Sequence, residues 1–253
     1  MNTDYGTFYG VGVGPGDPEL LTLRAHRLLG AVDVICYPAC KPGASSYAFR
    51  VVKELIDPTR QSVKGLVFPM SRDLSALKPI WRQSAGAIVE ELRAGKSVAF
   101  ITEGDPMLYS TFLHVYQVIA EEQPGIAVEI VPGVSSISAG AAAGRMAIAQ
   151  GEQRIAIIPA TYHAEQIRAT LERFDTVVLM KVGSVFDRVL DVLEEMGLAD
   201  KALLFSRVGA RKGFVTREVR AWRGRPLGYL TTLMVVKDPN PSFEPEAGAE
   251  ERE

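Results

Sequence analysis

Cysteine and histidine are scarce in this sequence: of 253 residues, 2 are cysteine and 3 are histidine. Cys36 and Cys40 are separated by three residues, which is not the two-residue spacing of redox or zinc motifs. The histidines, His26, His114 and His163, lie far apart and have no cysteine or carboxylate at ligand spacing. We therefore expect no metal site and interpret both cysteines as small buried hydrophobic residues beside a strand end.

Long apolar runs and an excess of charge of one sign are also lacking. No stretch reaches the length of a membrane span, and the first residues, MNTDYGTFYG, lack the basic and apolar segments of a secretory signal. The formal net charge of -2 favours neither a nucleic acid nor a membrane as the general partner. The composition, 47% hydrophobic and 23% charged, is ordinary for a globular protein. We expect a cytoplasmic protein.

Apolar runs of strand length alternate with longer periodic stretches typical of helices, which predicts an α/β fold. The pattern restarts after AQGEQ, and its last part, which includes an expected strand over 216–222, predicts that antiparallel strands join a second sheet. We expect two α/β domains, residues 1–121 and 122–237. The acidic, proline-punctuated tail over 238–253 has too few apolar groups to become ordered.

The segment YGVGVGPGDPELLTLRA, residues 9–25, places four glycines at alternate positions before a predicted helix. A dinucleotide-binding motif needs G-x-G-x-x-G, and neither register fits because Pro15 or Asp17 stands where the third glycine belongs. Pro15 has no N–H to offer a phosphate and Asp17 adds a negative charge, so a pyrophosphate is a poor ligand. Asp17 is instead predicted to cap the following helix, with Pro18 in its first turn. The remaining glycines would let the backbone approach a ligand closely.

Two further loops follow predicted strands: FITEGDPMLYST over 100–111 and EIVPGVSSISAG over 129–140. Ligands of open α/β sheets bind at the carboxyl ends of the strands, so we expect the three loops to converge on one crevice. Asp105 offers a carboxylate there, and Ser135 and Ser136 offer hydroxyl and N–H groups at the start of a small-residue helix that could pack closely against a neighbour. This mixture suits a neutral or cationic ligand with an amino-acid part and a nucleoside part.

The motifs VGVGPGDPELLTLRA, EGDPMLYST and VPGVSSISA, in this order and at these separations, are similar to those of the tetrapyrrole methylases, which use S-adenosylmethionine (SAM). The resemblance extends to about Lys237. Within the family, CYPAC, VFPMSRD and EGDPMLYSTF most resemble the branch that methylates carbon 20 of precorrin-2 in cobalamin biosynthesis. The resemblance implies a homodimer of two-domain chains with SAM in the cleft between the domains. The sequence does not distinguish a metal-free from a cobalt-containing substrate, and we favour the metal-free one.

The resemblance also implies which residues surround the cofactor. In the second domain, the expected neighbours of the adenine are Met180, Val208, Tyr229 and Thr231. In the three glycine loops, the expected cofactor contacts are Val13, Gly14, Gly104, Asp105, Met107, Leu108, Tyr109, Ser110, Ser135, Ser136 and Ile137.

Methylation of an electron-rich meso carbon needs orientation of donor and acceptor more than it needs a strong base. A proton must still leave that carbon, and its candidate acceptors are Tyr109, Asp105, Tyr37 and water. Tetrapyrrole substrates of this kind carry many carboxylates, so cations should line their site. The expected substrate contacts are Gly14, Pro15, Gly16 and Asp17, with the cations Lys41, Arg50, Arg72 and Arg145.

Alternatives remain open at this point. A methyltransferase of the same fold could act at another carbon or on uroporphyrinogen III, and a nucleotide-binding regulatory module could have lost catalysis. An NAD-dependent dehydrogenase is the third alternative. If the protein is a SAM-dependent methylase, SAM or its demethylated product should stabilise it against heat. If it is a dehydrogenase, NAD should do so instead.

Overall fold

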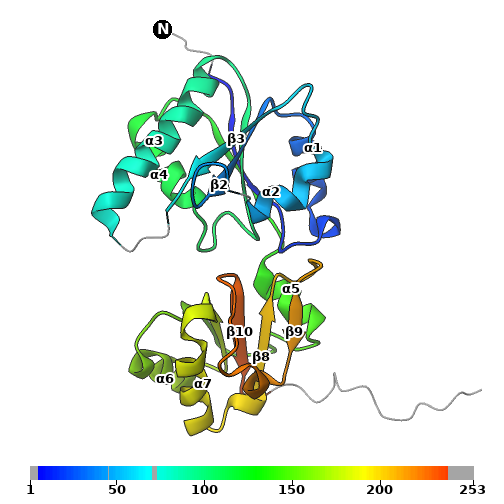
Figure 1. Ribbon diagram of the computed structural model, residues 1–253, viewed down its shortest axis with the longest axis vertical. Coiled ribbons are helices and arrows are strands. Elements are labelled where there is room, and N and C mark those ends of the chain that lie inside the picture. The colour runs from blue at the N-terminus through cyan, green and yellow to red at the C-terminus, as the bar shows by residue number, and fades with distance from the viewer. Residues whose placement is uncertain (1–4, 45, 70–72, 239–253) are drawn as a thin grey trace, which may run out of the picture. The chain divides into compact units, whose positions relative to one another are not determined.

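The computed structural model describes residues 5–44, 46–69 and 73–238. The chain divides into two compact units, Met1–Ser136 and Ile137–Glu253, and each is an α/β unit with one five-stranded sheet, as predicted (Figure 1). The expected boundary at residue 121 comes too early. The strand that follows it, β5 (Val128–Val131), pairs with β1 (Phe8–Gly12) and so completes the first sheet.

The sheet of the first unit is parallel, with the strand order β3-β2-β4-β1-β5. Within it, β1 pairs with β4 on one side and with β5 on the other. The carboxyl ends of these three strands are therefore neighbours at one edge of the sheet. Besides β1 and β5, the strands are β2 (Val34–Ala39), β3 (Ser62–Val67) and β4 (Val98–Thr102).

Helices cover both faces of this sheet because buried side chains alternate between its two sides. Phe8 and Phe100 pack with α3 and α4 on one side, whereas Val11 and Ile101 pack with α1 and α2 on the other. The helices are α1 (Leu23–Leu29), α2 (Tyr47–Val52), α3 (Leu74–Arg93) and α4 (Phe112–Glu122), with short 3₁₀ helices over Pro18–Leu20 and Lys53–Leu55.

The two cysteines have different surroundings. Cys36 lies on β2 within the core beneath α3 and α4, and burial raises the pKa of its thiol to about 12. Cys40 follows the end of the same strand and is exposed. The expectation of two buried cysteines is thus correct for Cys36 only.

Thiol labelling of the native protein should therefore modify Cys40 and leave Cys36 unmodified. At about pH 8, near the ordinary pKa of a cysteine, the Cys36 thiol stays protonated and inaccessible, and only the thiolate reacts. A chromogenic disulfide reagent should detect one thiol in the native protein and two after unfolding. Cys40→Ser should remove the native signal, and equal reaction rates of the two thiols would contradict this assignment.

The sheet of the second unit has the order β6-β7-β10-β8-β9. Its central strand β10 runs antiparallel to both neighbours, which confirms the predicted mixture of strand directions. The prediction of a strand over 216–222 is wrong: β9 ends at Thr216 and Val219–Trp222 is a 3₁₀ helix, whose Trp222 stacks on Phe214 with ring centroids 4.0 Å apart. The strands are β6 (Ile155–Pro159), β7 (Thr176–Met180), β8 (Ala202–Ser206), β9 (Phe214–Thr216) and β10 (Thr231–Val236).

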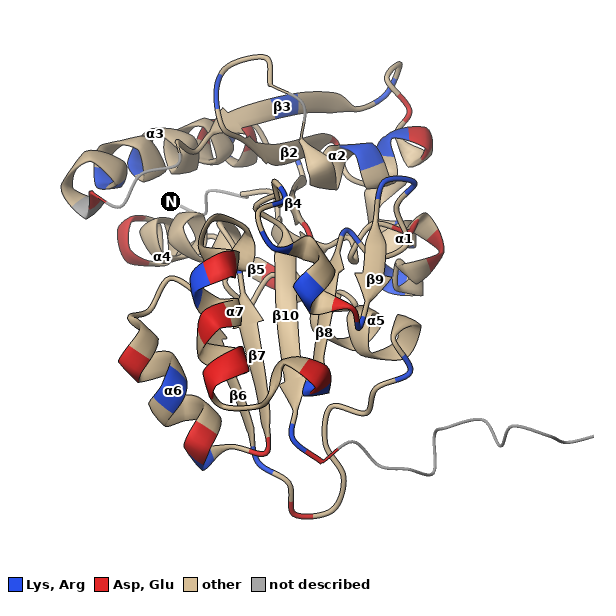
Figure 2. Ribbon diagram, turned by 60° about the horizontal axis from the view of Figure 1, so that its bottom comes forward, with Lys and Arg blue, Asp and Glu red and all other residues tan. Residues whose placement is uncertain are grey.

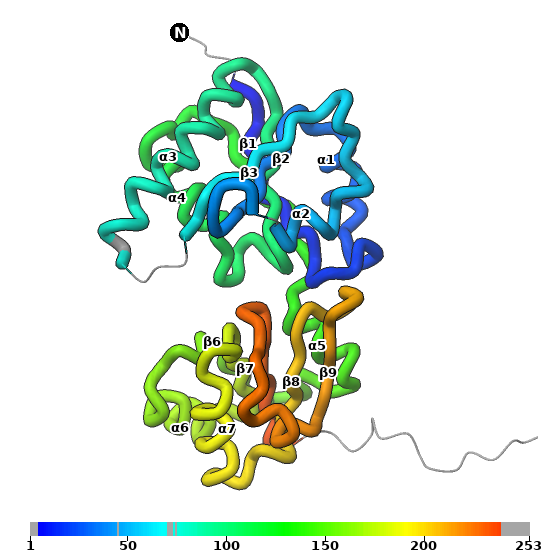
Figure 3. The backbone as a smooth tube through the Cα atoms, viewed as in Figure 1, coloured from blue at the N-terminus to red at the C-terminus, as the bar shows by residue number. Residues whose placement is uncertain are grey.

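Helices α6 (Ala164–Arg173) and α7 (Phe186–Glu195) bury their apolar sides in the core of the second unit, and acidic residues mark the outer surface of α7 (Figure 2). Helix α5 (Ser136–Ala143) packs against the same sheet at β8, where its Gly140 lies next to Phe205 (Figure 3). A Cβ on Gly140 would lie 2.5 Å from the Phe205 ring. The small residues of α5 thus permit the close packing that the sequence predicts.

Within the described residues, no helix combines the length and the apolar character needed to cross a membrane. The short 3₁₀ helices Val182–Val185 and Ala199–Lys201 complete the second unit.

Candidate functional site

The three glycine-bearing loops of the first unit meet at one edge of its sheet. They follow β1, β4 and β5, which are adjacent parallel strands. The Gly104 N–H donates to the Gly14 carbonyl at 2.8 Å, and the Val13 N–H donates to the Thr102 carbonyl at 3.0 Å. The predicted convergence of the loops is therefore present in the structure.

Glycines allow the loop backbones to touch directly. A Cβ on Gly12 would lie 2.5 Å from the Gly104 carbonyl oxygen, and a Cβ on Gly133 would lie 2.2 Å from the same oxygen. Gly14 and Gly104 have φ values of 76° and 64°, a region that side chains other than glycine rarely adopt. We call the segments 12–17, 102–110 and 131–136 the loop stack.

The Asp105 carboxylate joins two members of the loop stack. Its Oδ1 accepts the Met107 N–H at 2.8 Å, and its Oδ2 accepts the Gly133 N–H at 3.0 Å. Both oxygens are thus engaged by backbone donors of two different loops. This arrangement assigns Asp105 a structural task and makes it a poor candidate for the proton acceptor.

Hydrogen bonds of Ser110 hold the end of the second loop in place. Ser110 is buried, donates its hydroxyl to Thr102 Oγ1 at 2.9 Å and accepts the Phe112 N–H at 3.1 Å. Between these anchors, Met107 and Tyr109 remain 52% and 42% exposed. Tyr109 has a φ of 50°, a strained conformation for an aromatic residue, which is typical of functional sites. Met107 and Tyr109 are the side chains that this loop offers to a ligand, whereas Ser110 can contribute only through its backbone.

The turn after β1 is organised by its own polar groups. Asp17 caps the 3₁₀ helix Pro18–Leu20 by accepting the Glu19 N–H at 2.9 Å, so the predicted cap is confirmed. The helix it caps is a single 3₁₀ turn, and the α-helix α1 begins separately at Leu23, with Thr22 as N-cap. The Tyr47 hydroxyl of α2 donates to the Pro15 carbonyl at 3.0 Å. These contacts use up polar groups that a phosphate would need, which agrees with the argument against a pyrophosphate.

The expected substrate cations belong to different segments of the chain. Lys41 is exposed after β2, and the Arg50 guanidinium on α2 lies 5.5 Å from the Tyr47 ring centroid. Arg145 follows the carboxyl end of α5, whereas Ser135 and Ser136 lie at its beginning, so this helix separates Arg145 from the loop stack. Arg72 lies outside the described residues.

Of the other expected residues in the first unit, Tyr37 is engaged in packing. Its ring stacks on Phe49 with centroids 4.9 Å apart, and a Cβ on Gly65 would lie 3.1 Å from its hydroxyl oxygen. Val13 is completely buried, so only its backbone can meet a ligand. Leu108 is half-buried in the second loop, and Ile137 is buried in the first turn of α5.

The residues expected around the adenine lie together at one edge of the second sheet. β10 is flanked by β7 and β8, with Thr232 opposite Met180 and Thr231 opposite Ser206. Val208 is buried in the loop after β8, and Tyr229, which is 48% exposed, precedes β10. The Thr231 hydroxyl donates to the Gly228 carbonyl at 2.7 Å and thereby fixes the entry into β10. In the described part of the chain, no group of three or more His, Cys, Asp or Glu residues is placed to hold a metal ion.

Several residues of these two edges were not singled out from the sequence. Gly12 and Gly133 make the closest approaches in the loop stack, and Tyr47 supports the glycine turn. Lys181 and Arg207 adopt left-handed conformations directly after β7 and β8. The glycines were visible as motif members, but no signal in the sequence marks Tyr47, Lys181 or Arg207.

Known proteins resemble this chain over most of its length. The profile of the family described as Tetrapyrrole (Corrin/Porphyrin) Methylases matches residues 7–220. The Cobalt-precorrin-2 C(20)-methyltransferase of Salmonella typhimurium is 36% identical, across 92% of this chain and 97% of that protein. The Precorrin-2 C(20)-methyltransferase of a Sinorhizobium species is 31% identical, across 80% and 84%.

A solved structure shows the same fold. The Uroporphyrin-III C-methyl transferase from Thermus thermophilus, complexed with S-adenyl homocysteine, superposes with a TM-score of 0.64 at 22% identity. The superposition covers 92% of each chain. At this identity the likeness extends to the fold alone.

Proposed function

This chain belongs to the tetrapyrrole (corrin/porphyrin) methylases, and on this premise we propose that it methylates carbon 20 of precorrin-2 in cobalamin biosynthesis, with SAM as the methyl donor. The main support is that relatives named for this reaction align with most of the chain at 36% and 31% identity. These relatives include one named for the cobalt-containing substrate and one named for precorrin-2 itself. We retain the metal-free substrate as our first expectation and cobalt-precorrin-2 as its alternative.

The loop stack fits SAM better than it fits a nucleotide phosphate. When bound, SAM supplies an electrophilic methyl group on a positively charged sulfur. Pro15 and Pro18 have no N–H, and the Glu19 N–H is already taken by Asp17, so the turn offers little to an anion. The proposed cofactor contacts are the backbone of the loop stack, the exposed Met107 and Tyr109, and in the second unit Met180, Val208, Tyr229 and Thr231.

The chain's own contribution to the reaction is orientation. The loop stack is held by direct backbone contacts and by Asp105, so the groups facing the ligand are fixed before it binds. Fixed positions for donor and acceptor can supply most of the acceleration in a displacement at an electron-rich carbon. Asp105 and Tyr37 are engaged in structural contacts. Of the three side chains considered as proton acceptors, we propose Tyr109 first, because its side chain is 42% exposed within the loop stack.

The deciding experiment incubates the protein with SAM and precorrin-2, and in parallel with SAM and cobalt-precorrin-2. We expect one new methyl group at carbon 20, located by NMR with isotopically labelled SAM. Reactions without SAM are the control. A methyl group at another carbon would indicate a different transferase of this family. Cofactor binding without turnover on any tetrapyrrole would indicate a regulatory module.

We also propose that the protein acts as a homodimer in the cytoplasm, as the family resemblance implies. Static light scattering of the purified protein should give the mass of two chains at micromolar concentration. The mass should stay constant on dilution across the range used in the activity assay. A mass of one chain throughout that range would contradict the dimer without affecting the proposed reaction.

A further inference from the structure

Two cations of the second unit are held in an unusual backbone conformation. Lys181 directly follows β7 with a φ of 61°, and Arg207 directly follows β8 with a φ of 49°. β10 lies between these two strands, so the two residues flank its start from opposite sides. Left-handed conformations are strained for residues other than glycine and concentrate at functional sites. Their symmetric placement here points to a task for the two side chains.

Both cations lie against the segment that enters β10. The Lys181 Nζ lies 5.1 Å from the centroid of the Tyr229 ring. A Cβ on Gly228 would lie 3.9 Å from an Nη of Arg207. The segment between Gly228 and Thr231 thus has one positive charge on each side.

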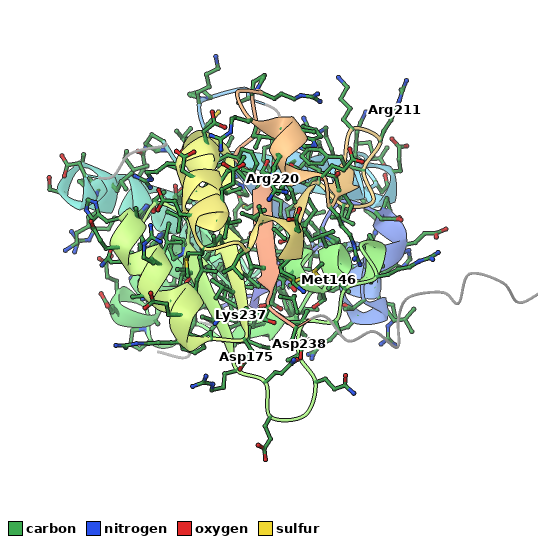
Figure 4. All side chains as sticks on the ribbon, turned by 90° about the horizontal axis from the view of Figure 1, so that it is seen from below. Met146, Asp175, Arg211, Arg220, Lys237 and Asp238 are labelled. Atoms are coloured by element: carbon green, nitrogen blue, oxygen red, sulfur yellow. The ribbon has the colours of Figure 1, made fainter. Side chains whose placement is uncertain are left out.

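The hairpin loop between β8 and β9 adds two further cations. Arg211 and Lys212 are exposed, and segment 207–213 contains no acidic residue. The loop is ordered by hydrogen bonds from the Ala210 N–H to the Arg207 carbonyl at 3.0 Å and from the Gly213 N–H to the Ala210 carbonyl at 2.7 Å. Figure 4 shows Arg211 at the periphery of the ribbon. We call Lys181, Arg207, Arg211 and Lys212 the basic edge.

At the opposite edge of the same sheet, two arginines form ion pairs with carboxylates. There the Arg154 Nε lies 3.5 Å from an Asp175 carboxylate oxygen, and Arg220 pairs with Asp200 and Glu194. Asp175, Lys237 and Asp238 lie close together at that edge in Figure 4. Among the described residues, no ion pair joins Lys181, Arg211 or Lys212 to a carboxylate. The charges of these three cations are therefore not balanced by a carboxylate of the described residues.

We propose that the basic edge binds the carboxylate side chains of the tetrapyrrole substrate. This inference rests on the proposed function and assigns the substrate contacts to residues other than Lys41, Arg50 and Arg145. The carboxyl ends of the strands are where α/β sheets bind ligands. Arginine offers paired N–H donors to a carboxylate, and lysine offers a point charge. The carboxylate of SAM's amino-acid part has the same chemistry, so the test must separate the two sources.

The first test compares Arg211→Ala/Lys212→Ala with the wild-type enzyme. We expect the KM for the tetrapyrrole to rise about tenfold, the loss typical of a charge-assisted hydrogen bond, while kcat and the Kd for S-adenosylhomocysteine stay unchanged. The difference should shrink at high ionic strength because salt screens exposed charges. Arg173→Ala/Lys201→Ala removes the same charge where β7 and β8 begin and is the matched control. This control should leave the KM unchanged.

The second test uses Lys181→Asn and Arg207→Asn, because asparagine tolerates the left-handed conformation and removes the charge. Binding of uroporphyrin III, a stable tetrapyrrole with carboxylate side chains, is followed by fluorescence in the protein loaded with S-adenosylhomocysteine. Weaker uroporphyrin binding at an unchanged melting temperature supports the proposal, even if precorrin-2 is not the substrate. Weaker S-adenosylhomocysteine binding with unchanged tetrapyrrole binding would overturn it in favour of the cofactor carboxylate. Unchanged binding of both ligands would also overturn the proposal, because the basic edge would then bind neither of them.

Discussion

Gly133→Ala should abolish binding of S-adenosylhomocysteine and lower the free energy of unfolding by about 3 kcal/mol, the upper range for overpacking a closely packed site. The added Cβ would lie 2.2 Å from the Gly104 carbonyl oxygen and 2.8 Å from the Gly12 Cα. Both atoms belong to the backbone of neighbouring loops, so no side chain can move aside to make room. The loop stack must separate, and its ligand contacts are lost with it.

Isothermal titration calorimetry with S-adenosylhomocysteine measures the first effect, and urea unfolding measures the second. Gly86→Ala is the matched control, because this glycine lies within α3 and no atom stands within 4 Å of its added Cβ. The control should bind normally and gain about 0.5 to 1 kcal/mol of stability, as alanine is the better helix former. Wild-type affinity in Gly133→Ala would show that the loop stack is not the cofactor site.

Asp105→Asn should weaken S-adenosylhomocysteine binding about tenfold to a hundredfold, the equivalent of losing one hydrogen bond to a charged group. The carboxylate accepts from both Met107 and Gly133, whereas an amide offers one acceptor oxygen and turns its NH₂ toward the other donor. The cross-loop connection would then break. Because Asp105 acts through the positions of other groups, kcat at saturating cofactor should fall less than affinity, and the pH dependence of kcat should keep its shape.

The opposite pattern would identify Asp105 as the proton acceptor. In that case kcat would fall by orders of magnitude while the Kd for S-adenosylhomocysteine stayed unchanged, and the pH profile would lose its acidic limb. Asp57→Asn is the control, because it also replaces a carboxylate that accepts a backbone N–H within its own loop. Asp57 accepts the Thr59 N–H at 2.9 Å and forms no cross-loop bond in the described structure. Its binding of S-adenosylhomocysteine should equal that of the wild type.

The convergence of the glycine loops could be predicted from the sequence because it follows from a general property of parallel sheets. Each loop follows an apolar strand, and the carboxyl ends of such strands share an edge. The roles of Gly12 and Asp105 could not be predicted in the same way. Which backbone atoms come within contact distance depends on the pairing of β1 with β4 and β5, and these strands lie far apart in the chain.

The errors of prediction also arise from contacts that the local sequence does not specify. Residues 216–222 have an alternating pattern that suits a strand, but stacking of Trp222 on Phe214 favours a turn of 3₁₀ helix. The expected boundary at residue 121 precedes β5, whose partner β1 belongs to the first unit. Left-handed conformations at Lys181 and Arg207 leave no mark in the sequence, since neither residue type favours them.

The division between the two units falls at Ser136, directly after the third segment of the loop stack. The chain therefore leaves the first unit through the loop whose Gly133 N–H donates to Asp105. A recombination event that replaced the second unit would have to join the new sequence within a few residues of Gly133. Selection for the loop stack therefore constrains where such exchanges can succeed.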